Sequence, residues 1–146
     1  MTITDSTSVA AAIEASLCDL INLSLLAKQA HWNVHGPGFR SLHLLLDEVA
    51  DLARSSGDEV AERAITLGHH PDGRATTVAA RSSSDLLPGA IADVDVIDAF
   101  DRILGTTIAG LRRAREAASD DPVTQDLLTG IEAGLHKQAW MIRAHR

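Results

Sequence analysis

Aromatic side chains are scarce in this chain of 146 residues: they make up 3% of the sequence, and tyrosine is absent. Strands draw on aromatic and β-branched residues, so this scarcity, together with abundant alanine and leucine, favours helices. Cys18 is the single cysteine, which excludes an intrachain disulfide and fits a reducing cytosol. We therefore expect a soluble, cytoplasmic, all-α protein.

Positive charge is scarce as well. The chain has 13 Lys and Arg against 20 Asp and Glu, a formal net charge of −7, and its first cation is Lys28. An acidic particle repels nucleic acid and attracts metal cations. The lack of an early basic stretch argues against a secretory leader. No uninterrupted apolar run approaches the roughly 18 residues that a membrane span needs.

Apolar residues recur at three- and four-residue steps in several long segments, as in helices that bury one face. We expect helices over about residues 9–34, 39–67, 95–119 and 122–144, after a polar, frayed lead at residues 1–7. The expected buried stripes are Ile13, Leu17, Leu20, Ser24, Ala27 and His31 in the first helix, Val96, Phe100, Ile103, Thr107, Leu111 and Ala114 in the third, and Leu128, Ile131, Leu135, Gln138 and Ile142 in the fourth.

The connection over residues 68–94 is polar and contains two prolines. At about 27 residues it is too long for an ordinary bundle loop, so we expect a short helix inside it. Two helical hairpins joined by one long crossover form the ferritin-like type of four-helix bundle. Neither an internal repeat nor a low-complexity linker interrupts the chain, which predicts a single domain over residues 1–146.

Five possible metal ligands follow one another in the first two helices: His31, His43, Asp47, Asp58 and Glu62. His43/Asp47 and Asp58/Glu62 are each four residues apart, so each pair lies on one helix face. With a helical step of roughly 100° per residue, Asp47, Asp58 and Glu62 lie at about 40°, 60° and 100° from His43 around the helix axis. All four therefore fall within one stripe of the second helix.

The two pairs cannot bind the same ion within one chain, because fifteen residues of helix place Asp58 about 22 Å from His43. A two-fold dimer of antiparallel helices would bring His43/Asp47 of one chain against Asp58/Glu62 of the other and create two identical sites. Imidazole with several carboxylates suits a borderline-hard ion such as Fe(II). The alternative is a solvated helix face that carries acids at helical spacing.

Glu-x-x-His, the motif of di-iron sites inside a bundle, is absent from the sequence. The nearest pair, Glu132 and His136, is four residues apart. This absence counts against ferritin proper and against a bundle oxygenase that acts on an organic substrate, and it fits a metal site at a subunit interface.

Two stretches carry a family resemblance. Residues 30–36 (AHWNVHG), followed by Phe39, His43 and Asp47-Glu48, resemble the first signature of the Dps family, the miniferritins known as DNA-binding proteins from starved cells. Residues 58–63 (DEVAER), followed by Leu67-Gly68, resemble the second. The resemblance covers nearly the whole chain.

This resemblance implies a hollow dodecameric shell with ferroxidase sites between two-fold-related subunits. His31, His43 and Asp47 would come from one subunit, and Asp58 and Glu62 from its neighbour. It further implies oxidation of Fe(II), preferably by hydrogen peroxide, and storage of ferric mineral in the cavity, which protects DNA from oxidative damage.

Three further residues have two interpretations each. Trp32 resembles the family's site-adjacent tryptophan, a possible electron donor, but could equally pack in the core. Asp121 and Asp126 match acidic residues that line iron-entry pores on a three-fold axis in the family. A carboxylate at position 120 or 121 could instead cap the fourth helix.

Basic residues are too few for the tail-mediated DNA binding of many family members. Residues 1–27 contain no cation, and the far end offers only Lys137, Arg143 and Arg146. Binding driven by counterion release needs several clustered phosphate contacts, so this composition argues against direct DNA binding. The alternative function is a nucleoid-binding structural shell with a weak or vestigial metal site.

Overall fold

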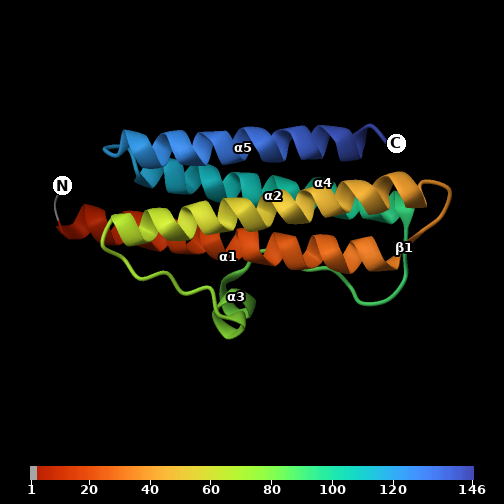
Figure 1. Cartoon of the computed structure of the whole chain (residues 1–146), viewed down its shortest axis with the longest axis horizontal. Coiled ribbons are helices and arrows are strands. Elements are labelled where there is room, and N and C mark those ends of the chain that lie inside the picture. Colours follow the sequence, from red (N-terminus) through yellow and green to blue (C-terminus); the bar gives the residue numbers. More distant parts are fainter. Residues whose placement is uncertain (1–2) are drawn as a thin grey trace.

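Four long helices lie side by side in the computed structural model, which describes residues 3–146, with side chains from residue 7 onward (Figure 1). They are α1 (Ile3–Asn33), α2 (Phe39–Thr66), α4 (Asp93–Ala117) and α5 (Pro122–Arg143). The short helix α3 (Ala75–Arg81) lies in the connection between α2 and α4, and the two-residue strands are β1 (Val34–His35) and β2 (Ile91–Ala92). The predicted four-helix bundle with a helix in its long crossover is confirmed.

The crossover decides which helix ends meet. α1 packs on α2 and α4, while α5 packs on α4 and α2. After α2 returns antiparallel to α1, the crossover runs back along the bundle, so α4 begins at the end where α2 began (Figure 1). There β1 and β2 pair in parallel, with Val34 opposite Ile91 and His35 opposite Ala92. The end of α1 and the starts of α2 and α4 therefore lie together.

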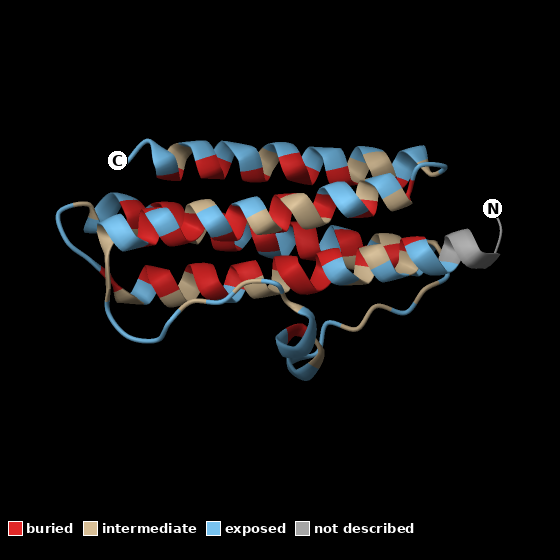
Figure 2. Cartoon of the chain, turned by 180° about the vertical axis from the view of Figure 1, so that it is seen from behind, coloured by how far each residue is buried: buried red, intermediate tan, exposed pale blue. Residues whose placement is uncertain are grey.

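The predicted buried stripes of the first, third and fourth long helices are confirmed, since every residue named for them is buried. Figure 2 shows these buried faces turned toward one another inside the bundle. Phe100, which is fully buried, is the largest side chain of this core. Burial of such side chains, at about 25 cal/mol per Å² of apolar surface, is the main force that holds the helices together.

We predicted a polar, frayed segment over residues 1–7, before the first helix. This prediction is wrong for residues 3–7, because α1 already begins at Ile3. Residues 1–2 lie outside the described residues. Val9 is the first buried side chain among the described ones, and Thr7 and Ser8 are exposed. Once a helix is nucleated, each added residue gains a hydrogen bond. The polar residues before Val9 can therefore continue the helix toward the N-terminus without contacts to the core.

The stretch Thr7–Asn33 of α1 is long and apolar enough, by length and composition alone, to cross a membrane. In the bundle, 56% of its apolar window is buried. α1 contacts both α2 and α4, and a helix that packs against two neighbours needs a wide apolar face. Packing in the core therefore accounts for the composition of α1.

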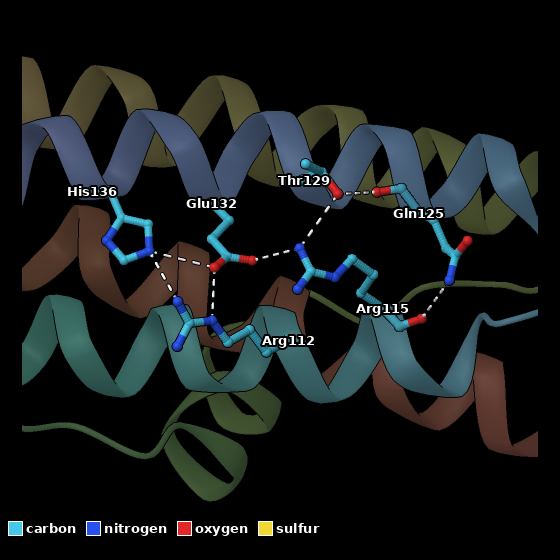
Figure 3. Close-up of polar contacts among 6 residues, drawn as sticks. All are labelled: Arg112, Arg115, Gln125, Thr129, Glu132 and His136. Atoms are coloured by element: carbon cyan, nitrogen blue, oxygen red, sulfur yellow. Dashed lines mark hydrogen bonds and ion pairs between the residues drawn. The ribbon is translucent and has the colours of Figure 1, made fainter.

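A cluster of charged side chains ties α4 to α5 (Figure 3). The buried Glu132 accepts hydrogen bonds from Arg112 Nε at 2.7 Å and Arg115 Nη1 at 2.8 Å, and His136 Nε2 lies 3.3 Å from its carboxylate. Burial raises the pKa of Glu132, but the hydrogen bonds from Arg112 and His136 and the charge of the arginines outweigh it and leave that pKa below its usual value. Glu132 and His136 thus belong to an ion-pair cluster that joins two helices.

Glu132→Gln is expected to lower the free energy of unfolding by about 1–2 kcal/mol at neutral pH, less than for a fully buried pair because the arginines are partly in water. Since folding lowers the pKa of Glu132, its contribution is present above the unfolded value of about 4.3 and is lost as the pH falls through the folded value. Denaturant unfolding from pH 7 to pH 3 checks this, with exposed Glu116→Gln as control. A gap between wild type and variant that does not shrink in acid would contradict it.

Candidate metal centre

A pair of stacked histidines lies at the end of the bundle where α1 leads into α2. His31 is near the end of α1, and His43 is in the second turn of α2. Their ring centroids are 3.6 Å apart, with 14° between the ring planes. His31 Nδ1 lies 2.6 Å from the carbonyl oxygen of His43, and His43 Nδ1 lies 2.7 Å from the carbonyl oxygen of His31.

These reciprocal contacts fix the chemistry of both rings. A carbonyl oxygen can only accept a hydrogen bond, so each Nδ1 carries the proton and donates it. In a neutral ring whose proton is on Nδ1, Nε2 has a free lone pair, and this is the form in which histidine ligates a metal. The ring of Phe39 lies 5.0 Å from that of His43, at an angle of 32° to it. The backbone thus holds two preset nitrogen donors.

Asp47 follows one turn after His43. Its Oδ1 lies 2.6 Å from Lys28 Nζ and 3.4 Å from His31 Nδ1. The hydrogen bond from Lys28, together with the charge of its ammonium group, lowers the pKa of Asp47 and outweighs the opposing effect of desolvation. This carboxylate is therefore ionised at neutral pH, and a metal ion that bound it would have to share it with the Lys28 ammonium.

Asp58 and Glu62 are exposed, further along α2. Asp58 borders a groove of about 460 Å³ whose lining is largely apolar and includes Leu17, Ile21, Leu25, Ala53, Gly57 and Ala61. Among the side chains that the structure describes, those of residues 7–146, no group of three or more His, Cys, Asp or Glu is placed to hold a metal ion. The structure thus brings His31, His43 and Asp47 together and leaves Asp58 and Glu62 apart from them.

Trp32 is 67% exposed. The interpretation that it packs in the core of its own chain is therefore wrong: the side chain points away from the bundle. Lys28 Nζ lies 5.9 Å from the centre of its ring, at the outer limit of a cation–π contact. Trp32 and Asp47 thus share Lys28 as a neighbour, which places the indole beside the candidate ligands.

Asp121 caps α5, as the capping interpretation predicted. Its carboxylate accepts a hydrogen bond from the backbone N–H of Thr124 at 3.2 Å and contacts the Thr124 hydroxyl, and Arg63 Nη2 lies 2.9 Å from it. Burial raises the pKa of Asp121, but the hydrogen bonds from Thr124 and Arg63 outweigh it and lower the pKa overall. Asp126 is exposed and borders a hollow between α2 and α5, together with Glu59.

Sequence reasoning missed the role of Lys28. The residue lies three positions before His31 and one turn before Trp32, so helical spacing places it on the same side of α1. That spacing indicates that Lys28 lies near the histidine. The ion pair between Lys28 and Asp47 could not be predicted from spacing, because it depends on how α1 and α2 pack.

Comparison with known proteins defines the class. Residues 10–146 match the family described as Ferritin-like domain. The Dps from Microbacterium arborescens in its high iron form has a TM-score of 0.92 and 29% identity to this chain, and the match covers 99% of this chain and 96% of that one. Both findings identify a ferritin-like helical bundle.

Curated relatives narrow the class. The DNA protection during starvation protein of Agrobacterium fabrum is 33% identical over 136 residues, 91% of this chain and 84% of that protein. The fine tangled pili major subunit of Haemophilus ducreyi is 35% identical over 147 residues, 99% of this chain and 78% of that protein. The chain belongs to the Dps family of ferritin-like proteins.

Proposed function

We propose that this protein is an iron-storing ferroxidase. It oxidises Fe(II), preferably with hydrogen peroxide, at sites shared by two-fold-related copies, and it stores the ferric product inside a dodecameric shell in the cytoplasm. DNA is protected because free iron and peroxide are removed together. The observation that carries this proposal is the stacked His31–His43 pair, whose Nδ1 atoms are both engaged and whose Nε2 atoms are left for iron.

The arrangement of α2 supports a shared site. Two copies of α2 that cross in reverse near residues 52–54 would set the histidine half of one chain against Asp58 and Glu62 of the other. The groove beside Asp58 is lined by apolar side chains of α1 and α2, and Leu25 at its border is 54% exposed. Burial of this apolar surface would stabilise the contact between two copies.

The donor set suits the proposed reaction. Carboxylates favour Fe(III) over Fe(II), while the imidazoles still allow Fe(II) to bind. Two Fe(II) ions would each give one electron to a peroxide molecule, whose O–O bond breaks, and the ferric ions would take up oxygen from peroxide and water with release of protons. When peroxide accepts both electrons together in this way, no hydroxyl radical is released.

A direct test is to mix the metal-free protein with Fe(II) and limiting peroxide and to follow ferric absorbance. We expect clear acceleration over buffer and slower oxidation when dioxygen replaces peroxide. A rate equal to that of buffer would instead support the alternative, a nucleoid-binding structural shell with a weak or vestigial metal site.

We propose that Trp32 donates an electron when a one-electron oxidant forms at the site. Its exposure and its position beside Lys28 and Asp47 support this role. Trp32→Phe is expected to remove a tryptophan-centred radical signal seen by electron paramagnetic resonance during peroxide turnover, with little change in Fe(II) oxidation. Trp140→Phe, which alters an exposed tryptophan on α5, should keep the signal. Loss of the signal in the Trp140 variant alone would contradict the assignment.

We propose that Asp121 and Asp126 line an entry path for iron where three subunits meet. Arg63 already neutralises much of the charge of Asp121, so the exposed Asp126 would supply most of the attraction for cations. Direct DNA binding is not part of this proposal, because the chain has a net charge of −7 and no cluster of cations at its start.

A further inference from the structure

The turn between α1 and α2 determines where the two histidines lie. His31 is three residues before Val34, the first residue of β1, and His43 is four residues after Phe39, the first residue of α2. Only Gly36-Pro37-Gly38 separates β1 from α2. Since stacked rings 3.6 Å apart tolerate little displacement, the path of this turn controls the geometry of the pair.

Asp93, the first residue of α4, holds this turn from outside the hairpin. Its Oδ2 accepts a hydrogen bond from the backbone N–H of Gly38 at 2.6 Å, and its Oδ1 accepts one from Val94 N–H at 2.8 Å. Gly38 is the N-cap of α2 and has no side chain with which to cap. No acidic residue lies in the first turn of α2, a helix that the structure describes in full. Asp93 thus supplies, from another helix, the negative charge that the positive end of α2 favours.

The turn is shaped around this carboxylate. A Cβ atom on Gly36 would lie 2.8 Å from Asp93 Oδ1, and one on Gly38 would lie 3.0 Å from Asp93 Oδ2. Gly36 also has a φ of 116°, which side-chain-bearing residues rarely adopt. The two glycines therefore let the backbone approach Asp93 more closely than any other residue would. The β1–β2 pairing joins the residues directly before Gly36 and Asp93, because His35 pairs with Ala92.

We infer that Asp93 is a positioning residue for the His31–His43 pair. Its carboxylate fixes the start of α2 relative to the end of α1, and this keeps each imidazole Nδ1 on the carbonyl oxygen of the other histidine. Its effect on iron chemistry rests on the proposed function, whereas its effect on the ring geometry does not.

The test compares Asp93→Ala with Asp93→Asn. Crystal structures of the metal-free variants show the rings, and steady-state Fe(II) oxidation with peroxide gives kcat and KM. In Asp93→Ala we expect the rings to separate, at least one of the two Nδ1 hydrogen bonds to break, and kcat to fall by about tenfold or more. Asp93→Asn keeps an oxygen that can accept from Gly38 N–H, so it should restore the ring stacking and most of kcat.

Asp101→Ala is the matched control. Asp101 is also an acid of α4, and its ion pairs with Arg143 and Arg146 hold the end of α5. Its loss should lower stability but leave the stacked rings and kcat as in the wild type. If Asp93→Ala fails to fold, Asp93→Ser replaces it, because its hydroxyl is too short to reach Gly38.

The inference would be overturned if Asp93→Ala or Asp93→Ser kept the stacked rings and both Nδ1 hydrogen bonds. This holds whatever the variant does to stability. A wild-type protein that does not oxidise Fe(II) would refute the proposed function instead. The ring geometry of the variants would still decide the role of Asp93 in that case.

Discussion

The double substitution Asp58→Asn and Glu62→Gln is expected to slow Fe(II) oxidation by about a hundredfold or more while the fold stays intact. Both carboxylates are exposed, so their neutralisation leaves no buried group without a partner. In the proposed dimer they are the ligands that one chain supplies to the site of its neighbour. Steady-state oxidation with peroxide measures the rate, and thermal unfolding followed by circular dichroism measures stability.

Glu59→Gln is the control for this double variant. Glu59 is an exposed acid next to Asp58 on the same helix, but it is outside the proposed ligand set. Its substitution should leave the rate near that of the wild type. If Glu59→Gln and the double variant slowed oxidation to the same extent, the effect would come from the general charge of α2, and Asp58 and Glu62 would not be ligands.

His31→Ala is expected to cost both activity and stability. The imidazole is a proposed iron ligand, so its loss should lower the oxidation rate by about a hundredfold. The ring is also buried, stacks on His43 and donates to a backbone carbonyl. Its removal leaves a gap and a carbonyl without its donor, which should lower the free energy of unfolding by about 2 kcal/mol.

Oxidation assays and denaturant unfolding of this one variant check both effects. A stable His31→Ala protein with full activity would show that the stacked pair is neither a ligand pair nor a structural support. Together with the carboxylate variants, it separates the two halves of the proposed site: loss of a histidine should lower both stability and activity, whereas loss of the two exposed acids should lower activity alone.

Helical periodicity predicted most of the fold. The stripes that end in His31 in α1 and Ile142 in α5 are buried because three- and four-residue steps place their members on one helix face. Breaks at Gly36-Pro37-Gly38 and before Pro122 were also readable, since glycine and proline disfavour continued helix. The strands β1 and β2 were not predicted, because two-residue ladders depend on how the crossover docks.

One contact of the candidate site was predictable from the sequence. The short break at Gly36-Pro37-Gly38 predicts a tight hairpin that returns the second helix alongside the first and lets His31 approach His43, and the two rings stack. The Lys28–Asp47 ion pair and the Asp93–Gly38 hydrogen bond join elements 19 and 55 positions apart in the chain, and no periodic pattern reports on such contacts. Trp32 illustrates a further limit: an aromatic residue next to a buried histidine lies on the outer face, since neighbouring helix positions point in different directions.

Mixing two inactive variants tests most directly whether two chains share one iron site. One variant carries His31→Ala with His43→Ala, the other Asp58→Asn with Glu62→Gln, and equal amounts are unfolded and reassembled together. Each mixed dimer would regain one intact site out of two, so random pairing should restore about a quarter of the wild-type oxidation rate. Mass spectrometry shows whether mixed assemblies have formed. If they have formed and the mixture is still as inactive as its two components, the result contradicts a site divided between two copies of α2.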